Sequence, residues 1–147
     1  MRNNLKVAII GAGINGLYLA WKLAEKGNSV SVFEKKKEIG NNVCSGLFSE
    51  RIFDFIPQSK ELVRNRINSA HIHFPKRTIK IRFSKPFFVM SHSKLDKMTA
   101  LLAEKSGLKI NSGINIDSLP SGFDKIIGCD GANSVVRKIL NLPDPNF

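Results

Sequence analysis

The sequence predicts an α/β domain built on a parallel sheet, and three observations lead to this class. A short apolar strand over residues 5–10 runs directly into the glycine-rich segment 11–16. Apolar residues then recur at helical spacing over residues 14–26, and a second apolar strand follows over residues 29–33. A strand, a helix and a strand in this order predict a β-α-β unit, in which the strands are parallel and the crossover is right-handed.

The rest of the chain is divided by its periodicity, capping residues and turn residues. Ser93 and Gly107 are the expected N-cap and C-cap of a helix over 94–105. In chain order we expect a loop over 35–45, a helix over 47–56 ended by Pro57, strands over 67–74, 78–83 and 87–90, a helix over 94–105, strands over 108–110, 114–116 and 125–128, a turn over 130–134, a helix over 135–140 and a loop over 142–147.

Length and composition limit the class of protein further. The 147 residues suffice for one modest domain over 1–147, and 42% hydrophobic and 24% charged residues are usual for a soluble globular protein. No apolar run approaches the roughly 20 residues of a membrane-spanning helix. Two cysteines and no secretory signal favour a reducing, cytoplasmic location, and no Cys/His cluster predicts a metal site.

The glycine-rich segment predicts a phosphate-binding turn. Gly11 allows a tight turn, Gly13 lets the backbone approach a pyrophosphate, and Gly16 lets the helix lie close to the strand. The amides of this first helical turn, including those of Ile14 and Asn15, point toward a bound anion at the positive end of the helix dipole. Together these residues predict a Rossmann-like dinucleotide site.

An acidic residue at the end of the second strand supports this interpretation. Glu34 lies 18 residues after Gly16, near the spacing of a carboxylate that accepts hydrogen bonds from ribose hydroxyls. A carboxylate there repels a 2′-phosphate, so NADP is disfavoured at this site, although the adjacent basic run 35–37 weakens that exclusion. Lys35 is included among the expected cofactor-binding residues.

A second cluster lies near the end of the chain, where an apolar strand is followed by an acidic turn and a helix with Arg137 in its first turns. With this cluster the chain resembles the flavin-dependent group that contains the geranylgeranyl reductases and the aromatic-ring hydroxylases. In that family the N-terminal glycine motif and the distal Glu bind the ADP half of FAD, and a D-G-x-x-S-x-x-R segment lies beside the ribityl and pyrophosphate groups. Asp130, Gly131, Ser134 and Arg137 match that segment in order and spacing. From the residues alone, Asp130 is also suited to cap the following helix.

Two further matches favour the reductase branch of this family. Cys44 lies in the loop after the second strand, where the reductases have a cysteine near the flavin, and the resemblance implies a catalytic role in proton delivery or flavin tuning. A small loop residue without a catalytic role is the alternative for Cys44. The helix over 94–105 matches a family helix, although His92 replaces the family's arginine. The resemblance also implies that 62–92 is a β insertion forming part of a substrate domain.

The net charge of +11 is concentrated in residues 60–85, which contain eight basic residues and one acidic residue. Such a stretch suits an anionic isoprenoid lipid substrate or a membrane surface, so a peripheral membrane location is included in the prediction. A solvated surface is the alternative. Few aromatic side chains accompany the cations, so nucleic-acid binding is not expected.

The resemblance implies an FAD-dependent oxidoreductase that reduces isoprenoid double bonds through reduced flavin, with NAD(P)H or another reductant as electron donor. A flavin monooxygenase or hydroxylase is the first alternative. The chain ends just after the D-G helix, before a later G-D segment of the family. A non-catalytic or split dinucleotide-binding module, paired with a complementary C-terminal chain, is therefore the second alternative.

Overall fold

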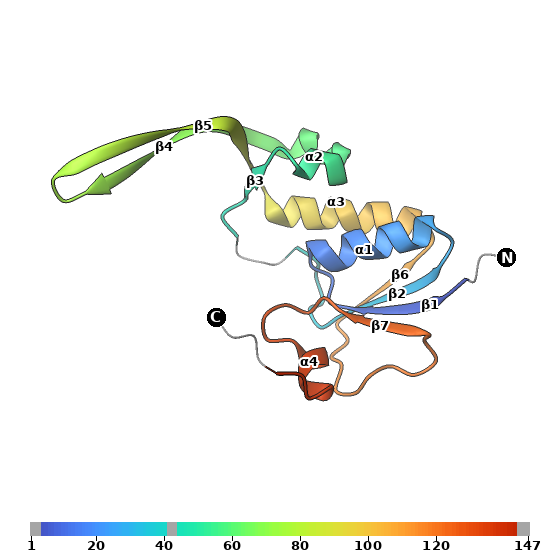
Figure 1. Cartoon of the computed structure of the whole chain (residues 1–147). Helices are drawn as coiled ribbons and strands as arrows, with labels where there is room; N and C mark the ends of the chain where they lie inside the picture. Colours follow the sequence, from blue (N-terminus) through green and yellow to red (C-terminus); the bar gives the residue numbers. More distant parts are fainter. Residues whose placement is uncertain (1–3, 41–43, 144–147) are drawn as a thin grey trace. The chain divides into compact units, whose positions relative to one another are not determined.

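The computed structural model describes residues 4–40 and 44–143, and it divides into two compact units (Figure 1). The sheet unit is formed by Met1–Asn41 with Asp96–Phe147, and the hairpin unit is formed by Asn42–Leu95. The predicted loops over 35–45 and 142–147 lie partly outside the described residues. The hairpin unit extends beyond both ends of the predicted insertion over 62–92.

The sheet unit contains four parallel strands. They are β1 (Lys6–Ile10), β2 (Ser29–Glu34), β6 (Lys109–Ser112) and β7 (Lys125–Gly128), in the spatial order β6-β2-β1-β7. The predicted α/β class with a parallel, Rossmann-like sheet is confirmed. β1 is flanked on both sides, and its last four residues are buried, because a central parallel strand is covered on both faces.

Three helices accompany this sheet. They are α1 (Ile14–Glu25), the part of α3 (His92–Lys105) that begins at Asp96, and α4 (Val135–Ile139). In Figure 1, α1 and α3 lie on one side of the sheet and α4 lies on the other. Ile9 and Leu17, from β1 and α1, are completely buried and belong to the core of this unit.

The turn between β1 and α1 depends on two glycines. Gly11 has a φ of +104°, and a Cβ placed on it would lie 2.4 Å from the carbonyl oxygen of Cys129. A Cβ on Gly16 would lie 2.1 Å from the carbonyl oxygen of Gly11. Both distances are far below van der Waals contact, so any side chain at either position would push backbone apart.

The turn between β7 and α4 is held by one carboxylate. Asp130 Oδ1 accepts a hydrogen bond from the Ser134 hydroxyl at 2.6 Å, and Oδ2 accepts from the amides of Val135 at 2.6 Å and Val136 at 3.3 Å. The Ser134 hydroxyl oxygen in turn accepts from the Arg137 amide at 3.1 Å. Burial raises the pKa of Asp130, but these hydrogen bonds outweigh burial and hold it below its ordinary value.

The hairpin unit is antiparallel. It contains β3 (Leu47–Ser49), α2 (Ile52–Phe55), the 3₁₀ helix η1 (Pro57–Leu62), β4 (Val63–Phe74) and β5 (Arg77–Met90), with the strand order β3-β5-β4. Across the pair, β4 and β5 shift register twice in their inner half and then pair regularly to the tip. No helix in the described part of the chain is long and apolar enough to cross a membrane.

The predicted helix over 47–56 is wrong in its first part. Residues Leu47–Ser49 form a strand because they pair with Phe87–Val89, which is a contact between distant segments that local periodicity does not contain. Pro57 begins η1, since proline is well suited to the first turn of a helix. The separate strands predicted over 78–83 and 87–90 are one continuous strand, β5.

Two other local predictions also differ from the structure. Residues 114–116 are not a strand, because β6 ends at Ser112 and Gly113 turns the chain with a φ of +77°. Ser93 is not the N-cap of α3, because the helix begins at His92 and Ser93 therefore lies inside its first turn. The Ser91 hydroxyl instead accepts a hydrogen bond from the Lys94 amide at 3.3 Å.

We expect Gly16→Ala to destabilise the fold by about 1–3 kcal/mol or more, because the new methyl group overlaps a backbone carbonyl that cannot rotate away. Urea unfolding followed by circular dichroism measures this loss. Gly13→Ala is the matched control, since a Cβ there meets nothing within 4 Å and the φ of −75° suits alanine. Equal unfolding midpoints for the two variants would contradict the packing argument.

We expect Asp130→Asn to remove a pH-dependent part of the stability. The pKa of Asp130 is lower in the folded chain than its ordinary value of 3.8, so its contribution is full above that value and is lost as the pH falls through the lower folded pKa. The free energy of unfolding should therefore fall less steeply on acidification below about pH 4 in the variant than in the wild type. Asp117→Asn, at an exposed position, is the control, and identical pH profiles for wild type and Asp130→Asn would rule out this role.

Candidate dinucleotide-binding site

Three loops meet at one edge of the parallel sheet. β1 runs into Gly11, β2 ends at Glu34, and β7 runs into Asp130, and the register pairs Ile10 with Phe33 on one side and with Gly128 on the other. The pairing continues beyond the strands, since the Gly11 amide donates to the Phe33 carbonyl at 2.7 Å. In open α/β sheets, ligands bind outside the carboxyl ends of the strands where the strand order reverses, and here that point lies between β1 and β7.

The N-terminus of α1 presents its amides at this edge. The first four amides of a helix have no intrahelical acceptor. The N-cap residue is Gly13, which has no side chain to accept from them, and no acidic residue lies in the first turn. This end of the helix, with Ile14, Asn15 and Gly16 in its first turn, therefore has the electrostatics of an anion site.

Gly13 differs from the other two glycines of the turn. Gly11 and Gly16 are required by close backbone contacts, whereas a Cβ on Gly13 would meet no atom within 4 Å. The space in front of Gly13 is open in the folded chain. A phosphate group can approach the backbone there, so the residues present fit a dinucleotide.

Glu34 is fixed beside this turn by two hydrogen bonds. Its Oε2 accepts from the Ala12 amide at 2.7 Å, and its Oε1 accepts from the Lys36 amide at 2.9 Å. An ionised carboxylate can accept about four hydrogen bonds, so capacity for two ribose hydroxyls is left. Lys35 is exposed directly after Glu34.

The structure uses Asp130 and Ser134 to cap α4, which is the role that the residues alone offered as the alternative to flavin contact. Arg137 is half-buried on α4, and its amide joins this cap. Gly131 has a φ of +87° and turns the chain into the cap. A direct contact between this segment and a cofactor stays a prediction.

Cys129 lies between the two turns. The Cβ of Cys129 would be 3.2 Å from a Cβ on Gly16, so the side chain packs against the start of α1. Burial, and secondarily the negative charge of Asp130, raise the pKa of the Cys129 thiol. A thiol that stays protonated is a poor nucleophile, so Cys129 is suited to packing and not to nucleophilic catalysis.

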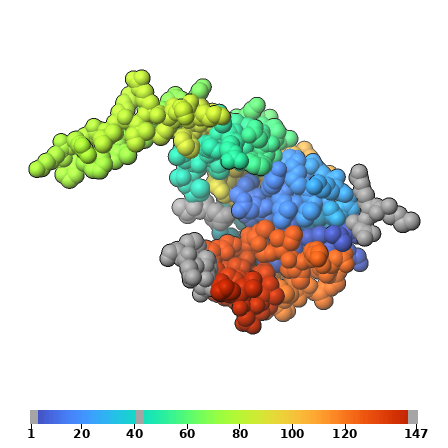
Figure 2. All heavy atoms as spheres, viewed as in Figure 1, coloured from blue at the N-terminus to red at the C-terminus, as the bar shows by residue number. Residues whose placement is uncertain are grey.

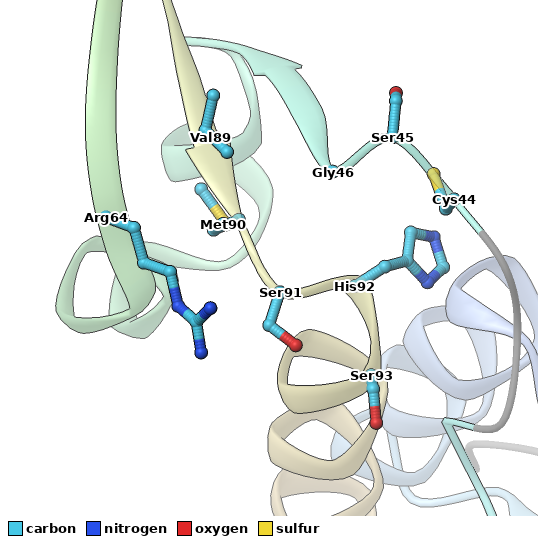
Figure 3. A pocket seen from close by; sticks show the side chains of 9 residues that line it. All are labelled: Cys44, Ser45, Gly46, Arg64, Val89, Met90, Ser91, His92 and Ser93. Atoms are coloured by element: carbon cyan, nitrogen blue, oxygen red, sulfur yellow. The ribbon is translucent and has the colours of Figure 1, made fainter.

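Cys44 lies in the other unit, where it is exposed and lines a cavity of about 280 Å³ (Figure 3). Figure 3 shows Arg64 of β4 on one side of this cavity, and Ser91, His92 and Ser93, at the start of α3, below it. The His92 ring also stacks on Phe48, with centroids 5.8 Å apart. Sequence reasoning did not find Arg64 and Ser91 as cavity residues, because their neighbourhood arises from the pairing of β3, β4 and β5.

Metal ligation has no geometric support in the part of the chain that is described, where no three His, Cys, Asp or Glu side chains gather. His71 and His73 alternate along β4 and so share one face of the hairpin, and their ring centroids are 6.3 Å apart. The two rings alone do not form a metal site.

Comparison with known proteins agrees with this geometry. Residues 9–59 match the family model of the NAD(P)-binding Rossmann-like domain. This range covers the last two residues of β1, the glycine turn, α1 and β2, and it therefore includes two of the three loops of the candidate site.

Three curated relatives have different reactions in their names. The chain is 28% identical over 148 residues to a UDP-galactopyranose mutase of Mycoplasma genitalium, covering 99% of this chain and 30% of the relative. It is 30% identical over 128 residues to a thiamine thiazole synthase of Pyrococcus horikoshii, covering 86% and 47%. It is 27% identical over 117 residues to a digeranylgeranylglycerophospholipid reductase of Methanocella arvoryzae, covering 75% and 30%. The chain thus spans less than half the length of these relatives.

Two solved structures share the fold. A geranylgeranyl bacteriochlorophyll reductase-like protein from Thermoplasma acidophilum superposes with a TM-score of 0.70 at 24% identity, covering 87% of this chain and 39% of that one. PqsL, a probable FAD-dependent monooxygenase from Pseudomonas aeruginosa, superposes with a TM-score of 0.76 at 17% identity, covering 96% and 46%. The resemblance seen in the sequence is confirmed at the level of the fold: the chain has a Rossmann-like dinucleotide-binding fold that is shared with geranylgeranyl reductase-like proteins and FAD-dependent monooxygenases.

Proposed function

We propose that the sheet unit binds the ADP half of FAD and that the chain is the dinucleotide-binding part of a flavin-dependent oxidoreductase. The observation that carries this proposal is the open space in front of Gly13, at the N-terminus of α1, which has no side-chain cap. The neighbouring residue, Ala12, donates its amide to the carboxylate of Glu34. Neither packing nor backbone conformation requires a glycine at this position, because a Cβ would meet no atom within 4 Å and the φ is −75°. A bound pyrophosphate gives a reason for it.

Each part of the edge has a task in this proposal. The amides at the start of α1 would hold the pyrophosphate, and the two remaining acceptor positions of Glu34 would bind the ribose hydroxyls. Since Glu34 is fixed by the Ala12 amide, it cannot swing away from a 2′-phosphate, so FAD and NAD are favoured over NADP at this edge. A bound flavin supplies hydride and electron transfer, and the protein supplies its position.

For the reaction, we propose reduction of an isoprenoid double bond through reduced flavin. Reduction of an isoprenoid double bond, with NAD(P)H or another reductant as donor, is supported by the name of the Methanocella relative and by the fold of the Thermoplasma protein. Oxygen activation is the alternative, supported by the fold of PqsL. Cys44 is the proposed proton donor of the reductase, because its thiol is exposed and lines the cavity of the hairpin unit. Rapid oxygen uptake during NAD(P)H oxidation that an aromatic substrate stimulates would favour the monooxygenase.

A second candidate is a dinucleotide-binding module that acts with a complementary chain. The specific observation in its favour is that all three loops of the candidate edge belong to the sheet unit, which has its own buried core. The module would bind FAD or ADP without turning over substrate. Flavin binding with no reductase or oxygenase activity would support this candidate.

We expect Gly13→Ala to lower FAD affinity about tenfold or more while lowering the unfolding free energy by no more than about 1 kcal/mol, which is the cost of alanine at an N-cap. Its methyl group fills space that folding leaves empty, so it collides only with a ligand. Titration of the purified chain with FAD, followed by flavin fluorescence, measures the affinity. The proposal fails if the wild type binds no FAD and no ADP, or if Gly13→Ala binds FAD as the wild type does.

We expect Glu34→Gln to weaken ADP binding about tenfold and to reduce the preference for ADP over an ADP carrying a 2′-phosphate on its adenosine ribose. The amide keeps the shape of the side chain but removes the negative charge that repels the extra phosphate. Competition of both nucleotides against FAD gives the ratio of affinities. Glu38→Gln, at an exposed position four residues further on, is the control, and an unchanged ratio in Glu34→Gln would remove the ribose role.

A further inference from the structure

The outer part of the β4–β5 hairpin is exposed on both of its faces. Residues 71–82 form a run of twelve positions that are all exposed, although antiparallel strands usually bury one face. In Figure 2 the yellow-green atoms of this hairpin form a narrow, elongated group, as expected for two paired strands. A two-stranded hairpin with no covered face is marginally stable in water, so this segment gains from a surface that covers it.

The outer hairpin, defined as residues 69–82, has one apolar face and one basic face. Directly paired residues share a face, and the register places the pairs Ala70–Ile81 and Ile72–Ile79 on one side together with Phe74. The side chains of this apolar face are 38–47% exposed: Ile72, Phe74, Ile79 and Ile81. At the tip, the Arg77 guanidinium lies over the Phe74 ring, 5.5 Å from its centroid.

The opposite face is basic. Its pairs are Ser69–Arg82, His71–Lys80 and His73–Thr78. Lys76 lies in the turn between the strands. The apolar face and the cations are thus separated by the thickness of a single pair of strands.

The whole hairpin carries cations without anions. Residues 63–90 contain seven Lys or Arg residues and no Asp or Glu. Within the described part of the chain, one of these seven, Lys85, forms an ion pair, with Glu50. The others are Arg64, Arg66, Lys76, Arg77, Lys80 and Arg82.

We propose that the outer hairpin, residues 69–82, docks on a membrane surface that contains anionic phospholipid. The apolar face enters the boundary between head groups and acyl chains, and the strands then lie at the depth of the phosphates, within reach of the cations. A bilayer offers both an apolar layer and a negative surface, which a nucleic acid does not. A second copy of the chain seated on the apolar face would cover that face but would leave the cations of the opposite face without anionic partners.

The proposal is independent of the flavin site, because no residue of the outer hairpin belongs to the glycine turn or to the Asp130 turn. Loss of FAD binding would leave it unchanged. Its test uses the full chain and vesicles alone.

Flotation with vesicles tests the proposal directly. We expect the wild-type chain to float with phosphatidylcholine vesicles that contain phosphatidylglycerol, with an affinity at least tenfold higher than for phosphatidylcholine alone, and binding should weaken as salt is raised. The double variant Ile72→Ser/Ile79→Ser removes the apolar face, and Lys80→Glu/Arg82→Glu reverses two cations. Each double variant should lower the affinity for anionic vesicles at least tenfold.

Matched controls separate these effects from general losses. Leu101→Ser removes an apolar side chain that is 59% exposed on α3, and Lys97→Glu reverses an exposed cation outside the hairpin. Both should bind vesicles as the wild type does. Phe74→Trp adds a reporter to the apolar face, and its emission should shift to shorter wavelength with anionic vesicles, because the native Trp21 is already buried.

Several results would overturn the proposal. They are equal binding to neutral and anionic vesicles, unchanged binding by both hairpin variants, or an unshifted Phe74→Trp emission. A change in molar mass by light scattering on Ile72→Ser/Ile79→Ser, without a change in vesicle binding, would assign the apolar face to a contact between polypeptide chains instead.

Discussion

The close approach of α1 to the turn after β1 is the constraint on which the sheet unit depends. Because Gly16 has no side chain, the start of α1 packs directly against the carbonyl of Gly11. Because Gly11 has no side chain, the glycine turn packs directly against the backbone of Cys129. This contact joins β1, α1 and the end of β7. The amides of α1, the carboxylate of Glu34 and the capped turn at Asp130 are therefore brought to one edge by packing, before any ligand is present.

Much of the sheet unit could be predicted from the sequence because its signals are local. The strand, the glycine turn, α1 and β2 follow one another within the first 34 residues, and each has its own periodicity or turn residues. The hairpin unit could be predicted less well. Leu47–Ser49 is a strand only because β5 lies beside it, some 40 residues later in the chain, and local periodicity does not report such a pairing. Likewise Ser91 and Arg64 share a cavity only after β4 and β5 have paired.

The site shows the same division between local and distant information. The spacing of Gly11, Gly13, Gly16 and Glu34 predicts their neighbourhood, but the sequence does not show which glycines folding needs. For Asp130, the same residue types serve a helix cap and a cofactor contact, and the hydrogen bonds to Ser134 and Val135 show the cap. The relatives carry different reactions in their names while sharing this region, and residues 9–59 match the NAD(P)-binding Rossmann-like domain, so the shared region does not by itself distinguish those reactions.

The open space at Gly13 has a consequence for how this chain changes over generations. Folding alone requires glycine at positions 11 and 16, because a Cβ at either position would overlap backbone atoms. Position 13 is the N-cap of α1, where serine, asparagine or aspartate would cap the helix at least as well as glycine. A lineage that had stopped using its ligand would be free to acquire one of these residues at no cost in stability. Under the proposed function, glycine at position 13 is therefore the residue of the turn that ligand binding alone would preserve, and its replacement would be the earliest sign that a descendant has kept the fold and lost the ligand.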